Sequence, residues 1–199
     1  MPRNATSKSS SKSTSKASHA ASKGSSHDAI HMLQEDHKKV TEMFEEFEQM
    51  KKKGDTDDEA KQILVESACT ELTIHAQIEE EIFYPAARDA IDDMDLLDEA
   101  EVEHASARQL ISELAAMQPD DDLYDAKFTV LGEYVKHHVQ EEEKQLFPKI
   151  KKSELDLDEL GQEMRERKLE LREELGVPSE DEDDYDDPES GTQSKRKVH

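Results

Sequence analysis

The sequence predicts an all-α protein, an up-and-down four-helix bundle followed by one further helical segment. Three observations support this prediction. Glu, Lys, Leu, Ala and Met are abundant between the two ends of the chain and favour helix. Apolar residues recur alternately three and four positions apart, and no stretch shows the period-two alternation of a strand. Proline and glycine divide the middle of the chain into segments of helical length.

Four segments supply the predicted bundle, and short loops join them. Their ends follow from glycine and proline, because proline lacks a backbone donor and disfavours helix at the residue before it. The four segments are about 28–51, 57–84 ending at Pro85, 95–117 ending before Pro119, and 122–147 ending at Pro148. A charged segment at about 153–175 stops at Gly176 and is expected to pack outside the bundle, with Gly161 as a candidate break.

The two ends of the chain differ in composition from the middle. Residues 1–26 hold five basic side chains, ten serines and no acid, and residues 177–199 hold an acidic run followed by a basic triplet. Such segments have too little apolar surface to offset the entropy of ordering, so both are predicted to be disordered tails. A basic arm for anionic partners and a transit-like leader are alternative interpretations of the first tail. The predicted divisions are a Ser/Lys-rich tail, a four-helix bundle, an accessory charged helix and an acidic tail, at 1–26, 27–150, 151–176 and 177–199.

Each bundle segment places one histidine on the stripe that is expected to face inward. The stripes are Leu33, His37, Val40, Phe44 and Phe47; Ala68, Leu72, His75, Glu79 and Ile82; Leu97, Ala100, His104, Ala107, Ile111 and Leu114; and Leu131, Tyr134, His138, Glu142 and Leu146. Two stripes also carry a glutamate one helical turn after the histidine. Buried carboxylates are costly unless they are paired or bound to metal. The pattern therefore favours an internal metal site over a metal-free bundle whose histidines are satisfied by hydrogen bonds.

The donor types narrow the choice of metal. Imidazole nitrogens mixed with carboxylate oxygens suit iron, manganese or zinc, whereas Ca²⁺ and Mg²⁺ prefer shells made of oxygen. The single cysteine, Cys69, excludes a thiolate site and lies off the inward stripe, so it is interpreted as a small packing residue. The neighbouring acids Glu80, Glu81, Glu141 and Glu143 are expected to face solvent.

A gapless repeat links the second and fourth segments. The runs His75–Pro85 and His138–Pro148 both read H-x3-E-E-x-x-[FL]-[YF]-P. The repeat also decides between two adjacent histidines, because only His138 holds the position equivalent to His75. His137 is therefore predicted to lie on the surface.

With these motifs, together with Asp36-His37 and Glu103-His104, residues 28–150 resemble the hemerythrin-like HHE cation-binding domain family. The resemblance implies a non-haem di-iron centre of the Fe–O–Fe type, with manganese or zinc less favoured. Carried over position by position, it implies six metal ligands, and the two glutamates would bridge the ions. These ligands are His37, His75, Glu79, His104, His138 and Glu142. The expected function is binding of O₂, NO or peroxide at an open iron position in a response to oxygen, oxidative or nitrosative stress.

One position departs from the pattern of the oxygen-carrying members, which have His-x3-His in the third helix. Four residues after His104 this chain has Arg108, which has no lone pair to offer a metal. The coordination position of the missing histidine would stay open, hold solvent or be taken by Glu101. Arg108 would pair with a carboxylate outside the metal site. The departure makes pure O₂ carriage less secure. The alternatives are an iron-responsive sensor whose folding depends on metal, and a di-iron peroxidase or oxidase with Tyr84 or Tyr134 as electron donor.

The net charge of the chain limits which macromolecular partners are expected. A charge of −24 repels phosphate backbones and anionic lipid, so neither nucleic acid nor membrane is expected at the folded domain. The absence of a hydrophobic leader and the single cysteine favour a cytoplasmic location. No exposed apolar heptad stands out, so the chain is expected to be a monomer.

Overall fold

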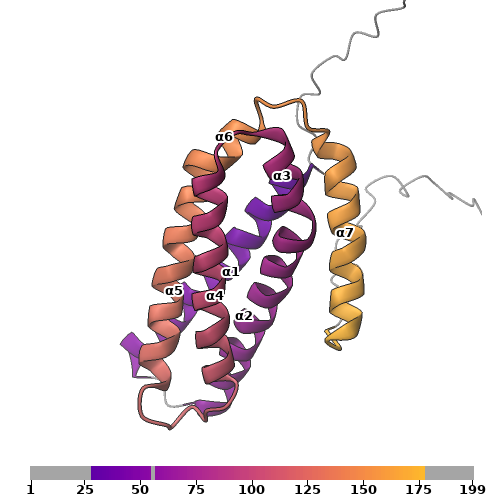
Figure 1. The fold of residues 1–199 in the computed structure, drawn as a ribbon. Helices are drawn as coiled ribbons and strands as arrows, with labels where there is room; N and C mark the ends of the chain where they lie inside the picture. Colours follow the sequence, from indigo (N-terminus) through magenta and orange to yellow (C-terminus); the bar gives the residue numbers. More distant parts are fainter. Residues whose placement is uncertain (1–27, 55–56, 178–199) are drawn as a thin grey trace, which may run out of the picture.

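The computed structural model describes residues 28–54 and 57–177 and has the predicted all-α architecture. Four long helices form an antiparallel bundle (Figure 1): α1 (Ala29–Lys53), α2 (Asp58–Ile78), α4 (Met94–Leu114) and α5 (Tyr124–Glu141). Helix α1 packs on α2 and α5, and α4 packs on α5 and α2. The predicted tails, apart from Val177, lie outside the described residues. None of the described helices is long and apolar enough to cross a membrane.

Side-chain caps set where several helices begin. Asp28 accepts a hydrogen bond from the backbone N–H of His31 at 2.8 Å at the start of α1, and Asp57 does the same for Ala60 at the start of α2. These contacts satisfy amide groups that have no partner inside the helix. Helix α1 ends at Gly54, which has a φ of 66° and a left-handed conformation that glycine adopts without strain.

The prediction that Pro85 and Pro148 end their helices was wrong. In both places the helix continues, through a π-helical turn and then a short α-helix, α3 (Tyr84–Ala90) or α6 (Phe147–Ile150). The π turns are η1 (Glu79–Phe83) and η2 (Glu142–Leu146). In a regular α-helix the ring of Pro85 would collide with the carbonyl of Glu81. The π turn closes instead with a bond from the Tyr84 N–H to the Glu79 carbonyl, which widens the helix just before the proline.

The accessory helix α7 (Leu157–Glu174) lies outside the bundle and packs on α1, α2 and η1 (Figure 1). Gly161 is buried within α7 and does not interrupt it, contrary to its suggested role as a break. Two largely buried ion pairs join this helix to the bundle. Lys168 contacts Asp36 of α1, and Arg172 lies 2.8 Å from Glu71 of α2.

The bundle core consists of two apolar clusters. One, at the α3, α6 and α7 end, includes Leu33, Ile78 and Phe83. The other, toward the opposite end, includes Val40 and Leu72. The helix residues between the two clusters are the inward histidines and glutamates. A polar layer therefore crosses the bundle between two apolar halves.

Candidate metal centre

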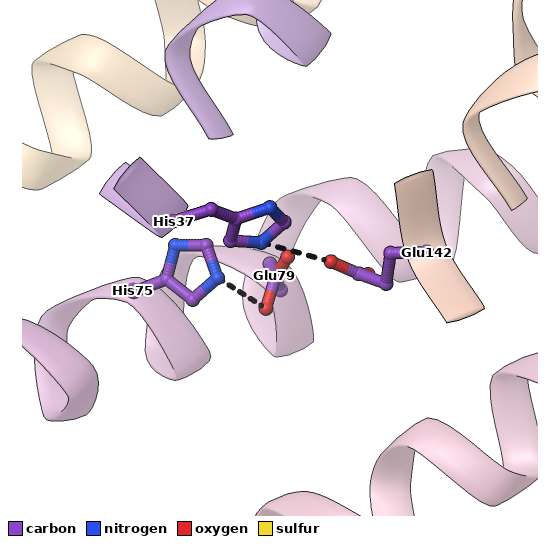
Figure 2. A group of neighbouring side chains, drawn as sticks. All are labelled: His37, His75, Glu79 and Glu142. Carbon is purple, nitrogen blue, oxygen red and sulfur yellow. Dashed lines mark ion pairs between the residues drawn. The ribbon is translucent and has the colours of Figure 1, made fainter. Parts of the chain in front are cut away.

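The polar layer brings together all six side chains predicted as ligands. All six are buried, with exposed fractions of 7% or less. Figure 2 shows His37 of α1, His75 of α2, Glu79 of η1 and Glu142 of η2 pointing toward one another. The Nε2 atom of His37 is 3.2 Å from a Glu142 oxygen, and the Nε2 atom of His75 is 3.2 Å from a Glu79 oxygen.

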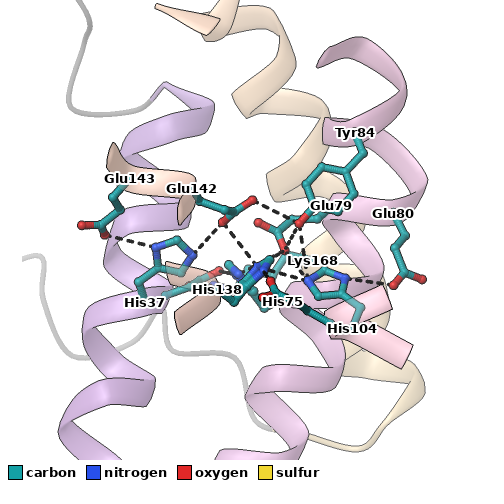
Figure 3. A network of polar contacts seen from close by, with 12 residues as sticks. His37, His75, Glu79, Glu80, Tyr84, His104, His138, Glu142, Glu143 and Lys168 are labelled. Carbon is teal, nitrogen blue, oxygen red and sulfur yellow. Dashed lines mark hydrogen bonds and ion pairs between the residues drawn. The ribbon is translucent and has the colours of Figure 1, made fainter. Parts of the chain in front are cut away.

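The remaining two histidines complete the layer from α4 and α5. The Nε2 atom of His104 is 3.3 Å from Glu79, and that of His138 is 3.6 Å from Glu142. The two imidazoles are themselves 3.2 Å apart between their Nε2 atoms. All four imidazoles therefore direct the same ring nitrogen at the two carboxylates (Figure 3).

Two groups of donors with metal-ligand spacing share one member. We name as the first position the group His37, His75, Glu79 and Glu142, and as the second position the group Glu79, His104 and His138. Within each group the ligand atoms lie within 4.8 Å of one another. Glu79 belongs to both groups and is therefore placed to bridge two ions. Glu142 belongs to the first group only, although its carboxylate also lies 3.6 Å from Nε2 of His138.

A second layer of carboxylates lies beside the opposite nitrogen, Nδ1, of each histidine and hydrogen-bonds to three of the four. Glu143 lies 3.1 Å from His37, Glu80 lies 2.9 Å from His104, and Glu103 lies 2.9 Å from His138. Asp36 lies 3.5 Å from His75. A carboxylate on Nδ1 fixes the ring orientation and makes Nε2 a better metal donor.

Sequence reasoning missed the role of Glu80 and Glu143, which were expected to face solvent. The signal was present in the repeat, because both copies of the motif carry Glu-Glu, and the second glutamate follows the bridging residue directly. In the structure that second glutamate reaches across to the histidine of a neighbouring helix. The residue just before each histidine of α1 and α4 does the same for α2 and α5. The layer is therefore pseudo-symmetric, because the two halves of the chain place equivalent carboxylates beside equivalent histidines.

Three features break this symmetry. Tyr84 and Phe147 hold equivalent positions, but only Tyr84 has a hydroxyl, which donates to Glu142 at 3.1 Å and lies 3.4 Å from Glu79 and from His104. Phe147 instead stacks on the His37 ring with an interplanar angle of 4°. Asp36 is paired with Lys168 of α7, whereas its counterpart Glu103 faces the exposed His137.

The π turn explains how Tyr84 reaches the site. In a regular α-helix, side chains five residues apart point about 140° away from each other. A turn closed between residues five apart brings them to one face instead. The widened turn therefore sets the Tyr84 phenol over the Glu79 carboxylate, and both are buried.

The position of the missing third-helix histidine is turned outward. Arg108 is 49% exposed and forms an ion pair with Glu80, the carboxylate that hydrogen-bonds to His104. Glu101 pairs with Arg88 at 2.7 Å and is 55% exposed, so it does not substitute for the missing ligand. The second position therefore has fewer protein donors than the first.

The exposure of side chains tests the sequence predictions for His137, Cys69 and Tyr134. His137 is exposed, as the repeat predicted, and Cys69 packs at the edge of the core, where burial raises the pKa of its thiol to about 12. Tyr134, assigned to the inward stripe, is 47% exposed, and Val135 takes the inward place. The stripe in α5 thus steps four residues from Leu131 where three were expected.

The electrostatics of the layer suit a cation. Burial and the nearby charge of Glu142 raise the pKa of Glu79 well above its usual value. Burial also opposes the charge of Glu142, but the charge of His138 and the hydrogen bond with His37 outweigh it and lower the pKa of Glu142. Burial lowers the pKa of His75 to about 4, so its lone pair is free at neutral pH.

A test of fit comes from unpaired atoms. Among the described residues, the buried side-chain atoms that lack a hydrogen-bond partner all belong to this site. They are Asp36 Oδ2, His37 Nε2, both ring nitrogens of His75, Glu79 Oε1 and Glu142 Oε2. Unsatisfied buried polar atoms are rare and costly, and a metal ion would satisfy the inward ones. The donor set therefore fits a borderline transition metal such as iron.

A small cavity adjoins the site. Its volume is about 40 Å³, its lining is almost entirely apolar, and the side chains of all four inward histidines contribute to it. Ala107, Ile111 and Val139 form part of its walls, and the partly exposed Arg108 and Tyr134 also line it.

The fold and the site define a cation-binding helical-bundle protein. The chain belongs to the hemerythrin family, because the model of the hemerythrin HHE cation binding domain matches residues 28–150.

Two similar proteins are informative in different ways. A hemerythrin HHE cation binding domain-containing protein from Mycobacterium kansasii has a solved structure that resembles this one with a TM-score of 0.62, at 23% identity, over 74% of this chain and 88% of that one. A protein of Nostoc sp. described as a DNA nickase is 27% identical over 143 residues, which are 71% of this chain and 39% of the relative. This chain thus spans well under half of the length of that relative.

The hydroxyl of Tyr84 offers a test of the polar layer. We expect Tyr84→Phe to lower the free energy of unfolding of the metal-free protein by about 1–2 kcal/mol, because a buried hydrogen bond to a carboxylate is lost. Urea unfolding monitored by circular dichroism measures this. Tyr134→Phe, at an exposed position, is the control and should change stability by less than about 0.5 kcal/mol. Equal effects of the two substitutions would contradict the assigned bond.

The contact between α7 and the site predicts a pH dependence. Burial raises the pKa of Asp36, but the hydrogen bond with His75 and the charge of Lys168 outweigh it and lower the pKa from 3.8 to about 2. The stability that Asp36 contributes is therefore complete above about pH 4 and is lost as the pH falls through about 2. His75 accounts for part of this shift, so Lys168→Met should cost about 1 kcal/mol at pH 7, and the difference from the parent should shrink toward pH 2.

Urea titrations of the metal-free protein at several pH values measure this difference. Lys38→Met is the control, because Lys38 is 75% exposed and its pair with Glu42 at 3.8 Å contributes little. A deficit for Lys168→Met that stays constant from pH 7 to about 2 would show that Asp36 is not the partner that matters.

Proposed function

We propose that this chain binds two non-haem iron ions and presents one of them to O₂, NO or hydrogen peroxide. The first position offers two histidines and two glutamates, and the second offers two histidines and the shared Glu79. Iron commonly takes six donors, so the second position is the one with room for an external ligand. Arg108, turned outward to Glu80, keeps the place of a further ligand free of protein donors.

The cavity is the observation that carries the choice of ligand. One water needs about 10–15 Å³ of space measured with a water-sized probe. A cavity of about 40 Å³ therefore has room for a diatomic molecule or a peroxide. Its apolar walls favour an uncharged ligand and disfavour bulk water.

Bound iron would supply redox chemistry and an open coordination position beside this cavity. The residues of the chain would do the rest. Glu80, Glu103 and Glu143 hold His104, His138 and His37 in the tautomer that presents Nε2 inward, and Asp36 lies 3.5 Å from Nδ1 of His75. Tyr84 holds a proton 3.1 Å from Glu142 at the edge of the second position, and burial raises the pKa of its hydroxyl well above the usual value, so it stays a donor.

Two observations support alternatives within this proposal. The unpaired atoms of the site favour an iron-responsive module, because an unfilled site destabilises the core and folding would then report metal occupancy. The buried phenol of Tyr84, beside both glutamates, favours a peroxidase or oxidase that draws an electron from it. Tyr134 lines the cavity but is 47% exposed, so it is the less sheltered of the two phenols.

The proposal places this chain in an oxidative or nitrosative stress response in the cytoplasm, as a monomer without a nucleic acid or membrane partner. The DNA nickase activity of the Nostoc relative is not carried over. The match covers 39% of that protein, and a net charge of −24 opposes contact with a phosphate backbone.

Anaerobic stopped-flow spectroscopy of the ferrous protein tests the proposal. Elemental analysis should first give two irons per chain. Mixing with NO or O₂ should then change the absorption spectrum in proportion to iron content. Reversal on removing O₂ would mean carriage, whereas irreversible oxidation with repeated turnover of hydrogen peroxide would mean a peroxidase. No spectral change with any of the three ligands would overturn the proposal.

A further inference from the structure

A second group of metal-ligating side chains lies on the surface beside the polar layer. Glu103 of α4 and His137 and Glu141 of α5 have ligand atoms within 4.8 Å of one another. The His137 Nε2 atom is 3.5 Å from Glu103 Oε1 and 3.8 Å from Glu141 Oε1. His137 is 65% exposed, and the carboxylates are 23% and 26% exposed.

The spacing and the chemistry of this group suit a divalent transition metal. His137 and Glu141 are four residues apart and share one face of α5, and Glu103 approaches from the neighbouring helix. One imidazole and two carboxylates are donors that Zn²⁺, Fe²⁺ and Mn²⁺ accept. The exposure of His137 leaves solvent to complete the coordination shell and lets the ring adjust to an ion.

Glu103 is held in place by the inner site, which distinguishes this group from ordinary surface pairs. Its second oxygen, Oε2, lies 2.9 Å from Nδ1 of His138, an inward histidine of the second position. One carboxylate thus faces the inner centre with one oxygen and the surface group with the other. The third donor of the surface group is therefore preorganised, and its position is set by a contact that does not depend on an outer ion.

We propose that Glu103, His137 and Glu141 form a third metal site, for a divalent transition-metal ion, that shares Glu103 with the inner centre. An ion there withdraws charge from Glu103 and weakens its hold on His138. Occupancy of the surface site should then be visible in the spectrum of a metal at the second position.

Another exposed pair in this chain provides a matched control. His31 and Glu35 of α1 are also four residues apart, with 3.3 Å between His31 Nε2 and the carboxylate, and 42% and 67% exposed. This pair belongs to none of the groups of three or more donors found among the described residues. Two donors of the same types, without a third, should bind far more weakly.

Zinc titration of the metal-free full chain counts the sites, with isothermal calorimetry for binding and elemental analysis after gel filtration for retention. The parent and His31→Ala should take up three equivalents, and His137→Ala and Glu141→Gln should take up two. These substitutions lie on the surface, and circular dichroism should show unchanged helix content. Equal stoichiometry in the parent and His137→Ala would overturn the third site.

A second measurement tests the shared carboxylate. The inner positions are filled with iron, and Co²⁺ is then added to the parent and to His137→Ala. The parent should bind one Co²⁺, seen in its visible absorption, and the iron bands should shift, whereas His137→Ala should show neither change. Co²⁺ binding without a shift would overturn the coupling through Glu103. If the inner positions bound no metal, the zinc count of the parent would fall to one and that of His137→Ala to zero, so the two proposals fail separately.

Discussion

Replacing Glu79 by glutamine is expected to abolish metal retention while leaving the metal-free bundle at least as stable as the parent. Glu79 faces His75 and His104 in both donor groups, so its loss removes a charged donor from both positions. Changing an outer partner of a metal ligand typically costs 10- to 100-fold in affinity, and loss of a shared ligand should exceed about 100-fold. Elemental analysis after dialysis against a weak chelator measures the effect.

The same substitution should not lower the free energy of unfolding of the metal-free protein. Burial and the charge of Glu142 raise the pKa of Glu79 well above its usual value, so ionised Glu79 destabilises the metal-free core. A neutral amide of the same shape removes that repulsion. The exposed Glu81, two residues away, provides the control substitution Glu81→Gln, which should leave metal content unchanged. Metal retention by Glu79→Gln equal to that of Glu81→Gln would remove Glu79 from the centre.

Removing the metal is expected to lower the unfolding temperature of the parent by about 8–16 °C. A ligand at 1,000 times its dissociation constant stabilises the folded state by about 4 kcal/mol. For a chain of this size, 1 kcal/mol corresponds to about 2–4 °C. The physical source of the effect is the set of unpaired inward atoms, which metal would satisfy.

Differential scanning calorimetry with and without a strong chelator measures this shift. Glu79→Gln is the matched control, because a chain that retains no metal should show the same transition in both conditions. The same fall in the variant would mean that the chelator acts elsewhere. No fall in the parent would mean that the histidines and glutamates are stable without metal.

The fold and the inward positions of the histidines could be predicted because they depend on local periodicity. His37, His75, His104 and His138 each fall on a stripe of apolar neighbours, and a helix of regular pitch turns such a stripe to the core. The repeat then selected His138 over His137, and their burial agrees with that choice. Whether the six inward residues bind metal stays a prediction, although the structure brings them together.

The wrong predictions concern positions where the helix departs from regular pitch, and contacts that the local sequence does not determine. A π turn shifts the phase of the stripe, so that Phe83 and Tyr84 are buried after Glu79 and Ile82 is only partly buried. The π turn before each proline lets the helix continue past it. Glu80 and Glu143 hydrogen-bond to histidines of other helices, which lie 24 and 106 residues away along the chain. No local sequence pattern specifies such tertiary contacts.

The two π turns also determine which changes in chain length the bundle can tolerate. Each turn contains one residue more than a regular helical turn, so it corresponds to an insertion of one residue. Deleting one residue between Glu79 and Tyr84 would return the helix to regular pitch, and Tyr84, then four residues after Glu79, would stay on nearly the same face. The proline ring would then meet the backbone carbonyl four residues before it. Within both motifs the spacing from glutamate to proline is therefore a fixed length, whereas the loops between the helices are free to vary.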